Sequence, residues 1–158
     1  MLKLTKKADY GLMAMKHLAE CRAACSAKDL AEAYGIPQEA LAKILQRLVK
    51  AGLLVSQHGT NGGYFLSRDA RRITALEVIM AIDGPLFITS CVTKSGSECG
   101  QVSKCTVREP LRKVNESIQE ALSRITIWEM NEDASSEPEN GEKISGADLV
   151  TLEVGVSS

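Results

Sequence analysis

Residues 26–52 read SAKDLAEAYGIPQEALAKILQRLVKAG, and this stretch decides the fold. Ser26 stands three residues before Asp29, which is the spacing of a capped helix start, and Gly35 ends the short helix that follows. Pro37 is tolerated in the first turn of the next helix, which Gly52 closes. The apolar residues of that helix recur at helical spacing, at Leu41, Ile44, Leu45 and Leu48. The stretch therefore predicts a helix, a tight turn and a helix.

The segments on either side extend this pair into a larger pattern. Apolar residues recur at steps of four and three from residue 5 to about residue 22, which predicts an amphipathic helix before the pair. After the pair come two short β-prone runs, at residues 53–55 and 64–66. The turn dipeptide Asn61-Gly62 lies between them, so we expect a hairpin. Three helices followed by a hairpin is the order of a winged helix-turn-helix, which we place at residues 1–85.

Composition favours a mainly α-helical fold. The 158 residues are 44% hydrophobic but only 4% aromatic, so aliphatic side chains supply most of the apolar mass. Thr74 and Glu77 have the T-x-x-E spacing of a capping box and predict one more short helix, which ends at Gly84. A β-sandwich, a barrel or an all-β enzyme is therefore not expected.

In a winged helix-turn-helix the third helix enters the DNA major groove and the hairpin contacts the backbone or the minor groove. The side of the third helix away from its apolar stripe carries amides, which read base edges, and cations, which bind phosphates. With two polar residues of the hairpin loop, the residues expected to contact DNA are Gln38, Lys43, Gln46, Arg47, Lys50, His58 and Asn61. The loop glycines Gly59, Gly62 and Gly63 are expected to let the backbone approach a phosphate. The alternative is an ordinary solvated helix face, because such faces are common.

The distribution of charge agrees with a polyanionic partner. The net charge is −1, but residues 1–72 hold 12 Lys+Arg and 6 Asp+Glu, whereas residues 73–158 hold 7 and 14. A basic N-terminal half favours double-stranded DNA as the ligand. No window has the length and hydropathy of a membrane span, and no apolar run of signal-peptide length follows the first lysines. We therefore expect no membrane association and a cytoplasmic location.

Three of the five cysteines call for a chemical explanation. Cys91, Cys99 and Cys105 lie within fifteen residues, in a glycine-containing cysteine loop at residues 86–106. This triad has three interpretations: ligands of an iron–sulfur cluster, a structural zinc site, or inert reduced thiols. Its wide spacing differs from the C-x2–4-C pairs of structural zinc sites and suits the larger perimeter of a cluster. An odd number of cysteines disfavours a secreted disulfide scaffold.

The remaining cysteines and the histidines suggest no catalytic site. Cys21 and Cys25 are separated by three residues, and we place both on the first helix as small apolar core residues. His17 and His58 lie on elements of the expected DNA-binding domain, and no pairing of a nucleophile with a base is indicated. The sequence therefore predicts a protein that is not an enzyme.

The C-terminal part divides into a helix and a tail. Apolar residues step alternately by four and three along residues 107–130, at Val107, Leu111, Val114, Ile118, Ala121 and Ile125. A single narrow heptad seam favours a partner helix, so we expect a dimerisation helix and a homodimer. The alternative is that this helix packs on its own domain. Residues 131–158 are acidic and lack periodicity, which predicts a disordered tail.

Five stretches in a fixed order carry a resemblance to a known family. They are MLKLTKKADYGLMAMKHLAE, GIPQEALAKILQRLVKAGLL, HGTNGGYFLSRD, ITALEVIMAIDG and the loop with its three cysteines. Over about residues 1–130 the chain resembles the Rrf2 family of bacterial repressors, and it is most similar to that family's iron–sulfur regulators. The resemblance implies a homodimeric winged-helix repressor whose Cys91, Cys99 and Cys105 bind an iron–sulfur cluster. It also implies that the protein senses cluster status and controls cluster assembly genes of the SUF type.

The resemblance leaves the fourth cluster ligand to be assigned. Some iron–sulfur members place a histidine three residues after the third cysteine, where this chain has Arg108, which cannot ligate iron. Others use an aspartate from the start of the first helix of the other subunit, and Asp9 stands at that place. We expect Asp9 to be the ligand, although the helix dipole alone also favours an acid there. The cluster type stays open between 2Fe-2S and 4Fe-4S. The competing interpretation is a zinc-binding or thiol redox-sensing interaction protein without a cluster.

Overall fold

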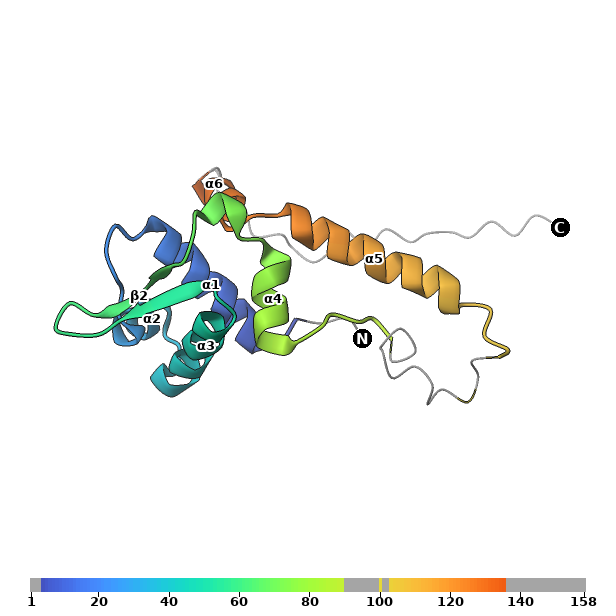
Figure 1. The fold of residues 1–158 in the computed structure, drawn as a ribbon, viewed down its shortest axis with the longest axis horizontal. Coiled ribbons are helices and arrows are strands. Elements are labelled where there is room, and N and C mark those ends of the chain that lie inside the picture. Colours follow the sequence, from blue (N-terminus) through green and yellow to red (C-terminus); the bar gives the residue numbers. More distant parts are fainter. Residues whose placement is uncertain (1–3, 90–99, 101–102, 136–158) are drawn as a thin grey trace, which may run out of the picture.

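The computed structural model describes residues 4–89, 100 and 103–135 of the chain (Figure 1). In chain order its elements are α1 (Lys6–Glu20), α2 (Ala27–Tyr34), α3 (Gln38–Lys50), β1 (Leu54–Gln57), β2 (Gly63–Leu66), the 3-10 turn η1 (Ala70–Arg72), α4 (Ala75–Asp83), α5 (Arg108–Arg124) and α6 (Ile127–Ser135). The two strands form an antiparallel hairpin directly after the first three helices. The predicted winged helix-turn-helix within a mainly α-helical chain is therefore confirmed. None of the helices in these ranges is long and apolar enough to cross a bilayer.

The interior of the winged-helix body is built around α3. Its four predicted apolar residues are all buried, at Leu41, Ile44, Leu45 and Leu48. They form one cluster with Met15 and Leu18 of α1 and with Leu30 of α2. Truncating a buried leucine to alanine costs about 2–5 kcal/mol, so this stripe strongly resists any rotation of α3 about its axis.

α4 packs against α1 and completes the body. Gly11 of α1 is buried, and a Cβ atom there would overlap the Cδ1 atom of Ile82. A side chain at this position would therefore push α4 away. The Thr5 hydroxyl, which caps α1, also donates to the Asp83 carboxylate at 2.7 Å, so the start of α1 is joined to the end of α4.

The starts of α2 and α4 are capped at the residues that the sequence predicts, but at α2 the Asp29 carboxylate has a different hydrogen-bond donor. Thr74 and Glu77 form a complete capping box at the start of α4. At α2 the Ser26 hydroxyl accepts from the Asp29 backbone N–H at 3.1 Å and donates to the Asp29 carboxylate at 2.7 Å. Aspartate is one methylene shorter than glutamate, so its carboxylate meets the hydroxyl instead of the backbone N–H of Ser26. Pro37 precedes α3 as its N-cap residue and does not stand inside the first turn.

The predicted hairpin is confirmed, with longer strands and a shorter loop than the two β-prone runs indicate. Its last paired residues are Gln57 and Gly63, which leaves residues 58–62 in the loop. Asn61 lacks the positive φ of a two-residue Asn-Gly turn, because among the described residues only glycines have a positive φ. Gly62 instead prevents a clash, because a Cβ atom there would lie 2.5 Å from the Gln57 carbonyl oxygen. The wing is therefore an open loop between two short strands.

The helix expected over residues 107–130 is in fact two helices. α5 ends before Ile125, which is extended, and α6 begins at Ile127. Another T-x-x-E capping box causes the break. The Thr126 backbone N–H donates to the Glu129 carboxylate at 2.8 Å, and the Glu129 N–H donates to the Thr126 hydroxyl at 3.2 Å. The prediction of one continuous helix is wrong at its C-terminal end.

α6 folds back onto the winged-helix body. Ile127 is fully buried in the core, and its N–H donates to the Ile73 carbonyl at 2.9 Å. The Asn131 side chain donates to the Lys16 carbonyl of α1 at 3.1 Å. The prediction of a disordered tail is therefore wrong for residues 131–135, which belong to α6. The rest of the predicted tail lies outside the described residues.

Glu77 joins the start of α4 to the segment after the wing. Its carboxylate accepts from the Thr74 N–H at 2.9 Å and pairs with the Arg68 guanidinium at 2.5 Å. Burial acts to raise the pKa of Glu77, but the hydrogen bonds from Thr74 and Arg68 outweigh burial and hold the pKa below its ordinary value. A carboxyl group whose pKa is lowered by folding stabilises the fold above its unfolded pKa. That stabilisation is lost as the pH falls through the folded pKa.

We predict that Glu77→Ala lowers the free energy of unfolding at pH 7 by about 1–2 kcal/mol, because it removes the box and leaves the Thr74 N–H without its acceptor. Urea unfolding followed by circular dichroism should show this difference shrinking as the pH falls through the titration of Glu77. The control is Glu32→Ala, whose exposed pairing with Lys28 contributes less than about 0.5 kcal/mol. A loss that is the same at every pH would contradict a role for the Glu77 charge.

Candidate functional site

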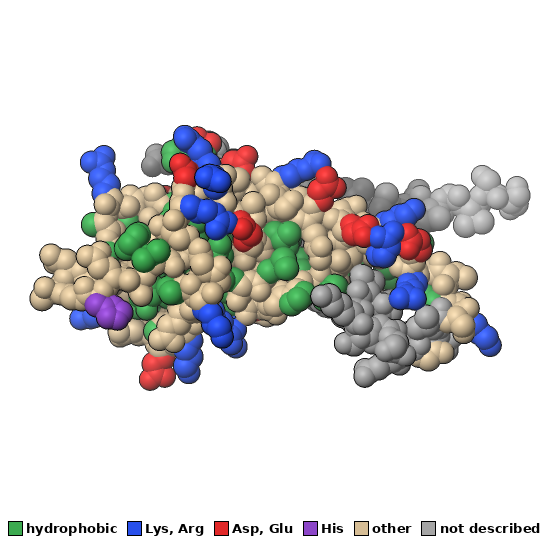
Figure 2. All heavy atoms as spheres, viewed as in Figure 1, with side chains coloured by type: hydrophobic (Ala, Val, Ile, Leu, Met, Phe, Trp, Pro, Cys, Tyr) green, Lys and Arg blue, Asp and Glu red, His purple; other side chains and the backbone are tan. Residues whose placement is uncertain are grey.

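The buried stripe of α3 leaves the polar residues of this helix on the outside of the body. All five predicted contact residues of α3 are exposed, namely Gln38, Lys43, Gln46, Arg47 and Lys50. Figure 2 shows Lys and Arg side chains projecting from the body in the region of α3. The last four share one face, because they are three or four residues apart. This convex face of amides and cations is suited to a DNA major groove.

A groove of about 600 Å³ lies between α3 and the hairpin. The polar side chains that line it are Ser26, Gln46, Ser56, Gln57 and His58. Asn61 is exposed in the loop and does not line the groove. Sequence reasoning missed Ser56 and Gln57. Their signal was available, because they are the polar end of a strand in which Leu54 is buried and the next three residues are exposed.

Two basic residues have surroundings that the sequence does not reveal. The Arg47 guanidinium donates to the Ile82 carbonyl at 2.8 Å, which joins α3 to the end of α4. Arg47 is thus a structural residue as well as an exposed cation. Lys7 of α1 shares a hollow of about 360 Å³ with Lys43 and Glu39 at the start of α3. Lys7 therefore extends the basic surface of α3, although it lies far from α3 in the sequence.

The wing is paired directly with the segment that precedes α2. The Cys25 N–H donates to the Tyr64 carbonyl at 3.1 Å, and the Tyr64 N–H donates to the Cys25 carbonyl at 2.9 Å. Gly63 allows this approach, because a Cβ atom there would lie 2.5 Å from the Cys25 carbonyl oxygen. Contacts within the protein thus also require glycine at positions 62 and 63, and the expected approach to a phosphate stays a prediction. Position and orientation of the wing depend on the Cys25 segment.

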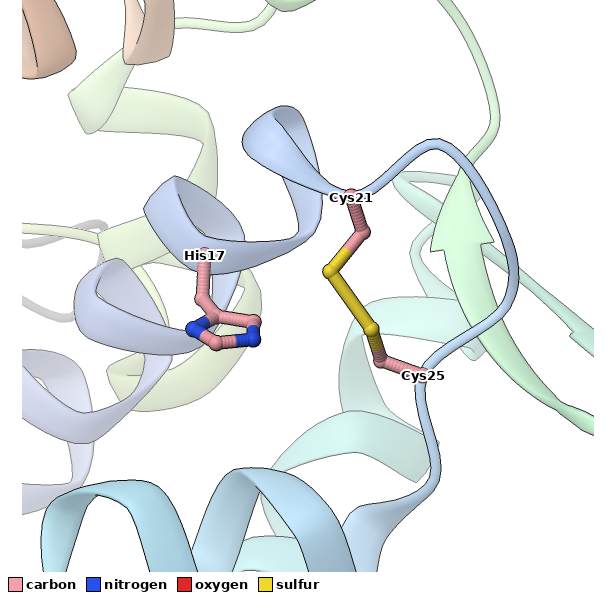
Figure 3. Close-up of side chains that lie close together, drawn as sticks. All are labelled: His17, Cys21 and Cys25. Carbon is pink, nitrogen blue, oxygen red and sulfur yellow. A yellow bond between two sulfur atoms is a disulfide. The ribbon is translucent and has the colours of Figure 1, made fainter.

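Cys21 and Cys25 are not core residues of α1, contrary to the prediction. Cys21 is the extended C-cap residue that ends α1, and Cys25 lies in the segment before α2. Both are half-buried, and the structure records a disulfide between them (Figure 3). His17, in the last turn of α1, lies alongside. Its imidazole nitrogen and the two sulfur atoms are all within 4.8 Å of one another.

Two of the four predicted cluster ligands lie in the described residues. Cys91 and Cys99 lie outside them, whereas Cys105 is a half-buried free thiol just before α5. A hollow of about 330 Å³ is lined by Cys105, Thr106, Arg108, Glu109 and Arg112. Asp9 is exposed in the first turn of α1 and does not line this hollow. Among the residues that the structure describes, the carboxylate lining this hollow with Cys105 is that of Glu109.

The charges in the Cys105 hollow favour an anionic ligand set. Glu109 pairs with Arg112 at 2.5 Å, and this hydrogen bond is the main reason that the pKa of Glu109 lies below its ordinary value. Glu109 in turn raises the pKa of Arg112, with a further contribution from Glu116, to which Arg112 also pairs. Arg108 brings a second guanidinium to the lining. Arg112 thus pairs with two carboxylates, and Arg108 is the cation of the lining that can offset a thiolate.

α5 extends away from the winged-helix body (Figure 1). Of the predicted seam, Val114 within α5 is 48% exposed and Val107, just before the helix, is 55% exposed, whereas Leu111 and Ile118 are half-buried. The helix is held to its own chain by polar residues: the Asn115 side chain accepts from the Ile88 N–H at 3.0 Å, and the Gln119 side chain donates to the Leu86 carbonyl at 2.8 Å. The apolar strip Val107, Leu111, Val114 and Ile118 is therefore only partly covered in the single chain, and Ile118 shares an apolar hollow with Leu4 and Leu86.

Comparison with known proteins identifies the family to which the chain belongs. Residues 4–133 match the sequence profile of the Rrf2 family, which is described as iron-dependent transcriptional regulators. The chain belongs to the Rrf2 family. The match spans the winged-helix body, the cysteine loop, α5 and most of α6, so it covers every surface described above. The protein is a DNA-binding transcriptional regulator and not an enzyme, as the sequence predicts.

Relatives and solved structures agree with this assignment. The HTH-type transcriptional regulator IscR of Xenorhabdus nematophila is 34% identical over 131 residues, which cover 82% of this chain and 79% of that protein. The structure of T. potens IscR has a TM-score of 0.64 and 34% identity, and covers 88% of this chain and 94% of its own. The structure of CymR, the global cysteine regulator of B. subtilis, has a TM-score of 0.69 and 27% identity, with coverages of 84% and 98%.

Proposed function

We propose that this Rrf2 regulator is a cytoplasmic, homodimeric repressor that binds operator DNA through α3 and the wing, and that its DNA affinity depends on an iron–sulfur cluster. The observation that carries the proposal is the exposed polar face of α3 beside the groove of the wing. The genes under its control are, on this proposal, those of SUF-type cluster assembly. This last step rests on the family resemblance and on the iron dependence in the description of the family.

The proposed DNA contacts divide by chemistry. Lys43 and Lys50 are exposed ammonium groups on one face of α3, suited to phosphates on the two sides of a groove. Gln38 and Gln46 carry amides, which can donate to and accept from the edge of an adenine. From the wing, His58 and Asn61 are suited to backbone contacts. Arg47 both faces the DNA and holds α3 to α4 through the Ile82 carbonyl.

The partly covered apolar strip of α5 supports the homodimer. An apolar strip on a projecting helix is stabilised when a second copy of the same helix covers it. A two-fold dimer would present two copies of α3 to successive major grooves on one side of the DNA. The strip is at its most exposed at Val107 and Val114, one heptad apart.

The Cys105 hollow supports the cluster. A half-buried free thiol beside the guanidinium groups of Arg108 and Arg112 fits a cofactor that is held by thiolates and carries negative charge. We propose Cys91, Cys99 and Cys105 as its cysteine ligands and Asp9 of the partner subunit as the fourth. The bound cluster would supply a redox- and oxygen-sensitive link. Cys105 directly precedes α5, so a change at its sulfur bears on the proposed dimer helix.

The DNA assignment predicts a change in salt dependence. Lys43→Ala and Lys50→Ala should each weaken binding to all sequences similarly and reduce the slope of log K against log salt by about one unit. Gln46→Ala should instead cost about 1–3 kcal/mol and relax the preference at one base. Fluorescence anisotropy on a duplex selected from a random pool measures both. Lys113→Ala on α5 removes the same charge and should leave the slope unchanged. A parental slope in the Lys43→Ala, Lys50→Ala double variant would contradict the assignment.

The dimer assignment predicts a change in mass. Val114→Glu should give monomers by light scattering, because it places a charge in the middle of the strip, while circular dichroism stays parental because the side chain is 48% exposed in the single chain. Ser117→Glu, on the same helix but outside the heptad positions, is the matched control and should remain dimeric. A dimeric Val114→Glu protein would show that α5 is not the interface.

The cluster assignment predicts colour and composition. The anaerobically purified parent should be brown and contain iron and sulfide, whereas a zinc or thiol interaction protein would be colourless. Cys105→Ser should lose iron and sulfide, and Cys21→Ser should keep them. Loss of the cluster should change operator affinity about 5- to 150-fold, the range of a coupling of 1–3 kcal/mol.

The same measurement separates the two carboxylates. Asp9→Ala should retain a cluster that decays faster in air, because an oxygen ligand is replaced by solvent, and Glu109→Ala should behave like the parent. The reverse result would assign the fourth ligand to Glu109. A colourless parent would contradict the cluster altogether.

A further inference from the structure

Three potential metal ligands meet at the end of α1. They are His17 in the last turn of the helix, Cys21 at its C-cap and Cys25 in the segment before α2 (Figure 3). One ligand atom from each residue lies within 4.8 Å of the other two. We propose that the reduced chain binds one zinc ion here, through the Nε2 atom of His17 and the sulfur atoms of Cys21 and Cys25. This site is separate from the proposed cluster and does not depend on it.

The chain geometry explains why these residues converge. His17 and Cys21 are four residues apart, so both lie on one face of α1. α1 then ends, because Cys21 has an extended backbone. The chain returns through three residues to Cys25, which is a spacing found between the cysteine ligands of structural zinc sites.

The separation of the two cysteines suits a shared ion. Their Cα atoms are 7.1 Å apart, although a relaxed disulfide usually spans about 4.4–6.8 Å. Two thiolates on a tetrahedral zinc ion, each about 2.3 Å from the metal, have sulfur atoms almost twice as far apart as in a disulfide. A shared ion therefore accommodates the wider Cα separation with less movement of the backbone. Mixed nitrogen and thiolate donors are the preferred ligands of zinc.

Tyr34 holds the imidazole of His17 in the orientation that metal binding needs. Its hydroxyl lies 3.1 Å from the Nδ1 atom of His17, and the two rings meet edge to face. With the proton on Nδ1 donated to Tyr34, the lone pair of Nε2 is free for an ion. Histidines that bind metals almost always have such a partner on the second nitrogen.

A bound ion would fix three parts of the DNA-binding domain together. Cys25 pairs with Tyr64 of the wing through two backbone hydrogen bonds, and the next residue, Ser26, caps α2. Zinc at this site would thus join the end of α1 to the start of α2 and to β2. We expect it to stabilise the domain against heat and to restrict the wing.

The experiment uses the full chain with Cys91, Cys99 and Cys105 changed to serine, so that the cysteine loop cannot bind metal. After reduction with a phosphine and desalting under argon, the protein is titrated with Zn²⁺ and, for its spectrum, with Co²⁺. We expect one tightly held equivalent, thiolate-to-cobalt charge-transfer bands and a higher melting temperature. The variants below are compared with this triple serine chain, so that the loss of Cys91, Cys99 and Cys105 is common to every measurement.

Single changes in this background identify the ligands. Cys21→Ser, Cys25→Ser and His17→Ala should each lower zinc affinity by at least about 100-fold, and Tyr34→Phe by about 10- to 100-fold, because it removes only the hydroxyl that orients His17. The other histidine provides a matched control, since His58→Ala should leave zinc affinity unchanged. If Cys25→Ser unfolds, His17→Ala and Tyr34→Phe still test the zinc site. Both change partly exposed side chains, so we expect both variants to fold. A reduced parent that holds no zinc through gel filtration would overturn the proposal, as would parental affinity in His17→Ala.

Discussion

The burial of four aliphatic side chains of α3 is the constraint on which the rest of the structure depends. Leu41, Ile44, Leu45 and Leu48 are enclosed by α1 and α2, and turning α3 about its axis would expose them. Lys43, Gln46 and Lys50 are therefore held on the outside of the body. The orientation of the face that we propose for DNA contact therefore follows from the burial of the opposite face of α3 in the core.

Polar contacts at the edges of the core then hold the neighbouring elements in place. Arg47 joins α3 to the Ile82 carbonyl of α4, and Thr5 joins α1 to Asp83 one residue later. On the opposite side the Cys25–Tyr64 pairing holds the wing beside the start of α2. α5 makes fewer such contacts. It extends away from the body, and apolar residues of α5 are exposed. The molecule thus divides into a fixed DNA-binding body and a helix that is suited to a partner.

Local signals in the sequence predict most of this body. The helix pair, the buried stripe of α3 and the Thr74–Glu77 box depend on residues within one or two turns, and the structure confirms them. The heptad steps predict a helix through Ile125, but the T-x-x-E box at Thr126 starts a new helix there, and Ile125 is extended. That signal was present in the sequence.

Other features have no local signal. The pairing of Cys25 with Tyr64, the Arg47 contact with α4 and the place of Lys7 beside Lys43 join residues that are 35 or more positions apart. The end of α1 is similar, since the sequence is compatible with a helix through Cys21, whereas in the structure Cys21 is extended and the chain turns toward the wing at Cys25. Such contacts depend on how the helices pack, which spacing rules do not determine.

The most direct test of the central claim is to map the DNA-bound surface by amide NMR. Isotope-labelled, cluster-free protein is titrated with its selected operator duplex, at concentrations where a weakened affinity still gives full occupancy. The account predicts that the largest shift changes occur along the exposed face of α3, at Lys43, Gln46 and Lys50, and in the wing around His58. Changes confined to α5 and α6, with α3 unmoved, would contradict it.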